Sequence, residues 1–341
     1  MKTNLSRRDF IRLTAIGAGV LALGGLGLKE ILAEPGLKTY AETRALLGTF
    51  VTIKVVDTSE NKARQAARDT FDEITRLSSV MSRFDSKSQL YALNTAGQVF
   101  GASSELVSVI KDANSYSELS RGTFDITVLP LLTLNQQSFE KYNTPPSQES
   151  IDETKTLVGY KNISIDGSDI SLSKQGARVT LDGVAVGYIV DRAASLLKDK
   201  GSSQVLIDGG GELSLCGTRQ DGNPWQIAIT NPRDTGAYYE VLSITGKSIA
   251  TSGDYQNFFT PDFRYNHIID PGTGISPPEL ASVTVIARDT IRADALTKAC
   301  FVMGRDEGMK FIESLPDAEA LFIDKQMNGY RTGGFPKGIS G

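Results

Sequence analysis

A single stretch, Ser248 to Gly274, constrains the fold more than any other part of the sequence. Between two short apolar runs it holds a polar segment with His267, the only histidine of the chain. The stretch ends in Asp-Pro-Gly-Thr-Gly, where the proline fixes φ and the glycines tolerate positive φ. A tight turn directly after a strand end predicts an imidazole held still at a pocket rim, with a pKa suited to proton transfer. The alternative is a hairpin with an incidental surface histidine.

Alternating apolar residues predict strands, and apolar residues at helical spacing predict helices. Asp-Gly and Gln-Gly turns separate several of the short strands, which favours antiparallel connections. The polar segment 136–148 carries two prolines and is expected to be a surface loop. The expected strands are 46–56, 163–166, 170–173, 178–181, 205–208, 213–217 and 281–287, and the expected helices are 61–79, 105–120 and 292–304.

The charge of the chain excludes one large class of partners. The 36 Lys and Arg residues are outnumbered by 40 Asp and Glu residues, which argues against binding to nucleic acid. Cys216 and Cys300 lie far apart in no ligand spacing, so we expect buried small side chains, and a disulfide between them stays open.

The N-terminus resembles a twin-arginine export signal. Arg7 and Arg8 precede an apolar run to Leu28 whose glycines make it a poor and short membrane helix. We therefore expect residues 1–33 to be a signal, with Ala33 at the cleavage point, and residues 34–341 to form a single domain in the periplasm. The protein would then meet the membrane only during export. A retained signal anchor is the alternative.

The order of the motifs carries a family resemblance. The string Ser252-Gly-Asp-Tyr, followed by Tyr265-x-His-Ile-Ile-Asp-Pro-x-Thr-Gly, resembles the signature of the ApbE family, the FAD:protein FMN transferases. Phe124-Asp-x-Thr with a following Pro-Leu, and Trp225-x-Ile-x-Ile, are similar to further boxes of that family. The resemblance runs from about Thr39 to the end of the chain.

The resemblance implies an α+β fold of two intertwined lobes, with mixed, largely antiparallel sheets flanked by helices. It also implies an enzyme that cleaves FAD and transfers FMN to a Thr or Ser hydroxyl of an exported or membrane redox protein, leaving AMP. His267 would take the hydroxyl proton. The carbonyl of Ala185 with Asp294 and Thr297 would hold Mg²⁺ on the diphosphate. The residues expected to line FAD are Leu47, Phe84, Thr123, Phe124, Asp125, Asp182, Tyr188 and Ile269.

Two of these residues have a structural alternative. Phe84 either stacks on an aromatic ring of the ligand or packs in the core. Asp125, flanked by apolar residues, accepts hydrogen bonds from a ligand or from backbone, and a turn-capping role is the alternative.

The sequence also departs from the family pattern. Leu47 replaces a methionine, Gln89 a glutamate, Asp182 a glycine and Val186 a lysine. Lys298 stands where the family has a metal-binding threonine, and protonated lysine cannot bind a metal. Either Thr297 takes over, or the ammonium occupies the cation's place. These departures keep two rivals open: a flavin-binding or maturation protein without transfer activity, and a hydrolase that splits FAD into FMN and AMP.

Overall fold

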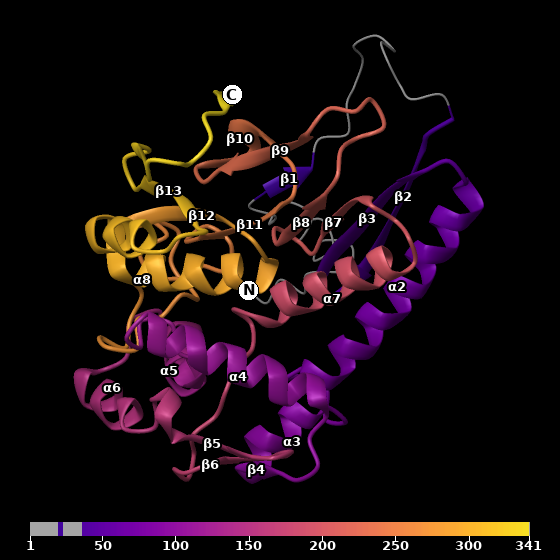
Figure 1. Ribbon diagram of the computed structural model, residues 1–341. Helices are drawn as coiled ribbons and strands as arrows, with labels where there is room; N and C mark the ends of the chain where they lie inside the picture. Colours follow the sequence, from indigo (N-terminus) through magenta and orange to yellow (C-terminus); the bar gives the residue numbers. More distant parts are fainter. Residues whose placement is uncertain (1–19, 23–35, 341) are drawn as a thin grey trace.

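The computed structural model describes residues 20–22 and 36–340, and Figure 1 shows their arrangement. An eight-stranded sheet forms its centre, with strand order β14-β13-β12-β11-β8-β7-β3-β2 and only antiparallel pairs. The strands are β2 (Lys38–Leu46), β3 (Thr49–Asp57), β7 (Gln204–Asp208), β8 (Leu213–Cys216), β11 (Lys247–Gly253), β12 (Leu280–Ala287), β13 (Glu319–Asp324) and β14 (Gly329–Arg331).

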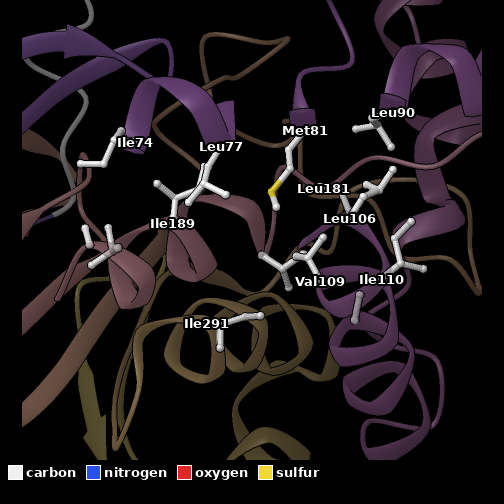
Figure 2. Packing of buried hydrophobic residues seen from close by; sticks show 14 of the residues in the cluster. Ile74, Leu77, Met81, Leu90, Leu106, Val109, Ile110, Leu181, Ile189 and Ile291 are labelled. Atoms are coloured by element: carbon white, nitrogen blue, oxygen red, sulfur yellow. The ribbon is translucent and has the colours of Figure 1, made fainter. Parts of the chain in front are cut away.

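Three long helices cover one face of this sheet, as Figure 1 shows: α2 (Glu60–Met81), α7 (Ala185–Asp199) and α8 (Thr290–Glu313). In Figure 2 apolar side chains of all three helices, with others from α4 (Ser104–Leu119), point toward one another. Burial of such a shared apolar face is what stabilises an amphipathic helix in a protein. The helices predicted at 61–79, 105–120 and 292–304 are thus present, and Gly304 interrupts α8 with a φ of 77°.

A smaller sheet covers the opposite face. It has the order β1-β9-β10-β15, from β1 (Val20–Ala22), β9 (Trp225–Asn231), β10 (Asp234–Ile244) and β15 (Ile339–Ser340). Apolar residues of β9 and β10 form one buried cluster with the outer face of the central sheet. Trp225 is part of that cluster and donates a hydrogen bond from Nε1 to the Cys216 carbonyl at 3.1 Å, so its role is structural.

A second lobe of short elements lies below the three helices in Figure 1. It contains α3 (Gln89–Ala96), α5 (Leu129–Tyr142), α6 (Gln148–Lys155), two 3-10 turns (Ile126–Val128 and Tyr160–Asn162) and a sheet of β4 (Gln98–Val99), β6 (Asp169–Leu172) and β5 (Ile163–Asp166). The chain enters this lobe after α2 and returns to the central sheet through α7. The α+β fold of intertwined lobes is therefore confirmed.

Two predictions for this lobe are wrong. Most of the segment 136–148 is helical, because Phe139 of α5 is buried and stacks on Phe259 with ring centroids 5.4 Å apart. The segment 178–181 is not a strand. The Asn94 side chain bonds both backbone groups of Val179, at 2.7 and 2.8 Å, and so takes the place of a strand partner.

The predicted strand 46–56 also begins later than expected. Leu47 and Gly48 form the turn of the β2–β3 hairpin, with φ values of 56° and 76°. A two-residue hairpin turn of this kind needs positive φ at both central positions. Gly48 is therefore used for its backbone conformation, since a Cβ added there would meet nothing within 4 Å.

The segment from Asp254 to Glu279 connects β11 to β12 and carries His267. It contains one isolated bridge and no strand, so His267 does not sit at a strand end as predicted. Asp254 is completely buried and anchors the start of the segment. It makes two bonds of 2.9 Å to Arg233 and one of 2.8 Å to Lys325, whose ammonium also reaches the Phe263 carbonyl.

Among the described residues, no helix is both long and apolar enough to cross a membrane. Cys216 and Cys300 are both free thiols; Cys300 is buried as expected, whereas Cys216 is only partly buried. The predicted signal segment lies outside the described residues except for Val20–Ala22.

Candidate functional site

A cavity of about 110 Å³ lies where the two lobes meet. Four segments far apart in the sequence form its walls: the stretch after α4, the turn before α7, the His267 segment and α8. Six of the predicted site residues line this cavity: Thr123, Phe124, Asp125, Asp182, His267 and Ile269. Lys298 of α8 lines the same cavity.

A second cavity of about 220 Å³ adjoins the first, because Asp182 lines both. Leu47, Phe84 and Ala185 also line it. The two cavities together thus contain nearly all the residues that the resemblance assigns to FAD. An elongated ligand with two ends would fit such a pair of adjoining cavities.

Arg83 holds the junction between the two cavities. Its guanidinium bonds the Asp182 carboxylate at 2.9 and 3.0 Å and lies 4.0 Å from the centroid of the Phe84 ring. Phe84 is 76% exposed, so the core-packing alternative for this residue is wrong. An exposed ring beside a cavity is free to stack on a planar ligand.

The position of His267 is fixed by the residues around it. Its backbone N–H donates to the Asn257 carbonyl at 2.8 Å. The neighbouring Asn266 is fully buried, exchanges two bonds with the Ser276 hydroxyl and accepts from the Ile268 N–H. The predicted turn follows, with the Gly274 N–H donating to the Asp270 carbonyl at 2.7 Å.

The imidazole of His267 is kept neutral. Burial, and then the positive charge of Lys298, lower its pKa to about 4. Nδ1 is buried and has no hydrogen-bond partner within the described part of the chain. A buried polar atom in a cavity wall needs a partner, and a ligand in the cavity would provide one.

Asp125 has the turn-capping role that was the structural alternative. One oxygen accepts from the N–H and hydroxyl of Thr127, at 2.8 and 2.6 Å, and the other accepts from the Tyr160 N–H at 2.8 Å. Burial raises the pKa of this carboxyl, in spite of these three bonds. Asp125 therefore lines the cavity and also holds the neighbouring backbone of the cavity wall in place.

Lys298 and two carboxylates form a compact cluster, which we call the cation cluster. The Lys298 ammonium is ion-paired with Asp294, one helical turn earlier, and lies 3.9 Å from Glu212. Asp294 is completely buried, and the side chain of Glu212 is 15% exposed. Burial opposes the charge on Lys298, but the two carboxylates outweigh it and raise its pKa. Burial and the nearby Asp294 raise the pKa of Glu212.

Two of the three residues predicted to bind Mg²⁺, Asp294 and Thr297, have other partners. One Asp294 oxygen faces the Lys298 ammonium, and the other accepts from the Gly187 N–H at 3.4 Å. The Thr297 hydroxyl is bonded to the Asp294 carbonyl and to Ser252, both at 2.7 Å. No group of three or more His, Cys, Asp or Glu side chains in the described residues is arranged to hold a metal. This arrangement does not fit Mg²⁺, which requires several free oxygen ligands.

Tyr188 is the one predicted FAD residue that lines neither cavity. It lies on α7, packed against the helical core. Arg83 and Glu212 were not singled out from the sequence. A charged residue directly beside an aromatic one, or directly after a glycine turn between two buried strands, is the signal that identifies them.

Comparisons with known proteins agree with this geometry. The ApbE family model matches residues 47–322. A FAD:protein FMN transferase of Vibrio cholerae is 32% identical over 317 residues, 90% of this chain and 95% of the relative. Another from Haemophilus influenzae is 29% identical over 331 residues, 92% of this chain and 94% of the relative.

Solved structures give the same result. The flavin transferase ApbE from Vibrio cholerae superposes with a TM-score of 0.78 at 27% identity, covering 88% of this chain and 98% of that one. The ApbE protein of Thermotoga maritima also reaches 0.78, at 31% identity, covering 87% of this chain and 97% of that one. On the sequence and on the fold, this chain belongs to the ApbE family.

Proposed function

We propose that this protein cleaves the diphosphate of FAD and transfers the FMN half to a Thr or Ser hydroxyl of an exported redox protein, releasing AMP. The observation that carries the proposal is the neutral His267 in the wall of the cavity at the junction of the lobes, with a ring nitrogen that has no partner among the residues the structure describes. The relatives named above as FAD:protein FMN transferases support the same activity.

In the reaction, the acceptor hydroxyl oxygen attacks the phosphorus of the FMN half. A new P–O bond forms, and the bond between that phosphorus and the bridging oxygen breaks. His267 accepts the hydroxyl proton, and AMP leaves with the bridging oxygen. Phosphoryl transfer of this kind depends on positioning and on charge neutralisation more than on covalent help.

The neutral imidazole is suited to this role in one specific way. A base must be unprotonated before it accepts a proton, and a pKa of about 4 keeps His267 unprotonated throughout the neutral range. The arrival of the anionic diphosphate adds negative charge near the ring and raises its pKa again. FAD binding thereby makes His267 a stronger base in the complex with FAD, where the proton is transferred.

The remaining wall residues position FAD. Phe84 offers an exposed ring to a planar group, while Arg83 neutralises Asp182 at the junction between the cavities. Mg²⁺, which the family resemblance implies, would neutralise the diphosphate when bound. Because the described donors do not fit it, no step above is assigned to a metal.

Transfer is tested by incubating the protein with FAD and a candidate acceptor and recording the intact mass of the acceptor. We expect addition of one FMN, and free AMP in equal amount. Free FMN with AMP and no change in acceptor mass would instead show hydrolysis. Bound FAD without any cleavage would show a flavin-binding protein.

His267→Ala separates chemistry from binding. Transfer should fall by about 10²–10⁴-fold, because a general base is lost. FAD affinity, measured by flavin fluorescence, should stay close to that of the wild type. Full transfer activity in this variant would place the base elsewhere.

We also propose export by the twin-arginine route to the periplasm, supported by Arg7 and Arg8 before the Gly-rich apolar run. Both residues lie outside the described part of the chain. Replacing both by lysine and fractionating cells tests this. Normal accumulation of the variant outside the cytoplasm would contradict it.

A further inference from the structure

The cation cluster of Lys298, Asp294 and Glu212 raises a question that the proposed function leaves open: which cation neutralises the FAD diphosphate. A buried carboxylate such as Asp294 requires a positive partner. In this chain the partner is already present on the same helix, one turn further on. Residues at i and i+4 of a helix lie on the same face, so the pair belongs to a regular helix and needs no distortion.

A divalent ion at Asp294 would conflict with this pair. It would have to displace the ammonium from the carboxylate or stand beside it, and two nearby cations in a partly buried site repel strongly. To take the Thr297 hydroxyl as a ligand, the ion would also have to break the bonds of that hydroxyl to Ser252 and to the Asp294 carbonyl.

The Lys298 side chain also lies where it can reach a ligand in the cavity. Its aliphatic stem passes beneath the turn before α7, where a Cβ added to Gly183 would lie 3.6 Å from Lys298 Cγ. The side chain lines the same cavity wall as His267 and is 20% exposed. An ammonium has three N–H donors. Asp294 and Glu212 account for at most two of these donors, which leaves one for a ligand in the cavity.

We propose that the Lys298 ammonium takes the place of Mg²⁺ beside Asp294 and donates a hydrogen bond to a diphosphate oxygen of FAD. Lysine is well suited to phosphate as a point charge. The inference rests on the proposed function for the identity of the ligand. It concerns which cation holds that ligand, so it is tested by binding measurements that need no acceptor protein.

The first measurement is calorimetric titration of Mg²⁺ into the ligand-free protein and into Lys298→Thr. We expect no saturable Mg²⁺ binding to the wild type. The variant should bind Mg²⁺ saturably, because it has a threonine hydroxyl at position 298 and lacks the competing ammonium. The second is FAD affinity with and without EDTA. Wild-type affinity should not change with EDTA, whereas that of Lys298→Thr should become dependent on metal.

Lys298→Met removes the charge but keeps the length of the stem. FAD affinity should fall by about 10- to 100-fold with or without Mg²⁺, the effect of losing one hydrogen bond to a charged group. Lys161→Met is the matched control. It removes a lysine from a neighbouring surface depression and should leave FAD affinity unchanged.

Saturable Mg²⁺ binding by the wild type together with loss of FAD affinity in EDTA would overturn the proposal. Unchanged FAD affinity in a folded Lys298→Met would overturn it as well. The Mg²⁺ titration of the wild type and its FAD affinity with and without EDTA test the proposal even if both variants fail to fold. Failure of the proposed function gives a different result, namely intact FAD bound without any transfer to an acceptor.

Discussion

The single histidine makes one prediction unusually direct. His267 should titrate near pH 4 in the folded protein, against an ordinary value of 6.5. The causes are burial of the ring and the charge of Lys298, in that order. A shift of this size favours the neutral imidazole by about 3 kcal/mol, since one pKa unit corresponds to about 1.4 kcal/mol.

The sign of the stability effect follows from the direction of the shift. A histidine with a depressed folded pKa binds its proton first in the unfolded chain. Its contribution to the free energy of unfolding is therefore full above pH 6.5 and is lost as the pH falls toward 4. At limiting FAD, transfer should likewise show no acidic limb at pH 6.5, because that rate reports the His267 pKa of the free protein.

NMR of the imidazole measures this without assignment, because the chain has one histidine. The protein must be free of a histidine tag, and the buffer should contain EDTA. The ring signals should move near pH 4 in the wild type and at higher pH in Lys298→Met, where the second cause is gone. Added FAD should raise the pKa by about 1 unit or more, because the diphosphate is anionic. Titration between pH 6 and 7 in the folded wild type would refute the reasoning.

Three further predictions concern stability and the junction of the cavities. Asp254→Asn leaves two basic side chains without their carboxylate and should cost about 3–5 kcal/mol in urea unfolding. Gly187→Ala places a Cβ 2.7 Å from the Ile291 Cα, a backbone clash that should lower Tm and cost about 1–3 kcal/mol. Arg83→Ala should weaken FAD binding about tenfold by fluorescence titration, because it leaves Asp182 unneutralised near an anionic ligand, and adding Asp182→Asn should restore it.

Each of these has a clear contrary outcome. Wild-type stability of Asp254→Asn would mean that its basic partners find other anions. An unchanged Tm for Gly187→Ala would mean that α7 and α8 separate at no cost. Equal FAD affinity in Arg83→Ala with and without Asp182→Asn would remove the electrostatic link between these two residues.

The sequence predicted long periodic elements and ordered motifs well. The helices around Phe71, Leu106 and Leu296 follow from a regular apolar spacing that their packing then uses. The segment 136–148 was missed because the apolar residues of α5 that pack on the His267 segment, such as Phe139, are diluted by polar ones. Only the tertiary partner shows that this surface is buried.

The same limit applies to the site. The string around His267 identified the residue, but its low pKa depends on Lys298, which is 31 positions away in sequence and adjacent in space. Glu212 could not be assigned to the cation cluster from its glycine turn alone. The strand predicted at 178–181 failed because a side-chain amide satisfied its backbone, and no local pattern distinguishes that from a strand partner.

The buried Asp254 has a consequence for how an acceptor protein must behave. Arg233, in the turn between β9 and β10, and Lys325, in the turn after β13, both bind this carboxylate, and the His267 segment begins at it. Opening that segment would expose a buried ion pair, so its motions are confined to costly local unfolding rather than to a swinging lid. The mobility that brings a hydroxyl to the imidazole must then come from the acceptor. The modified residue of the acceptor should lie in an extended or loosely held segment that can enter the cavity, because the His267 segment itself stays in place.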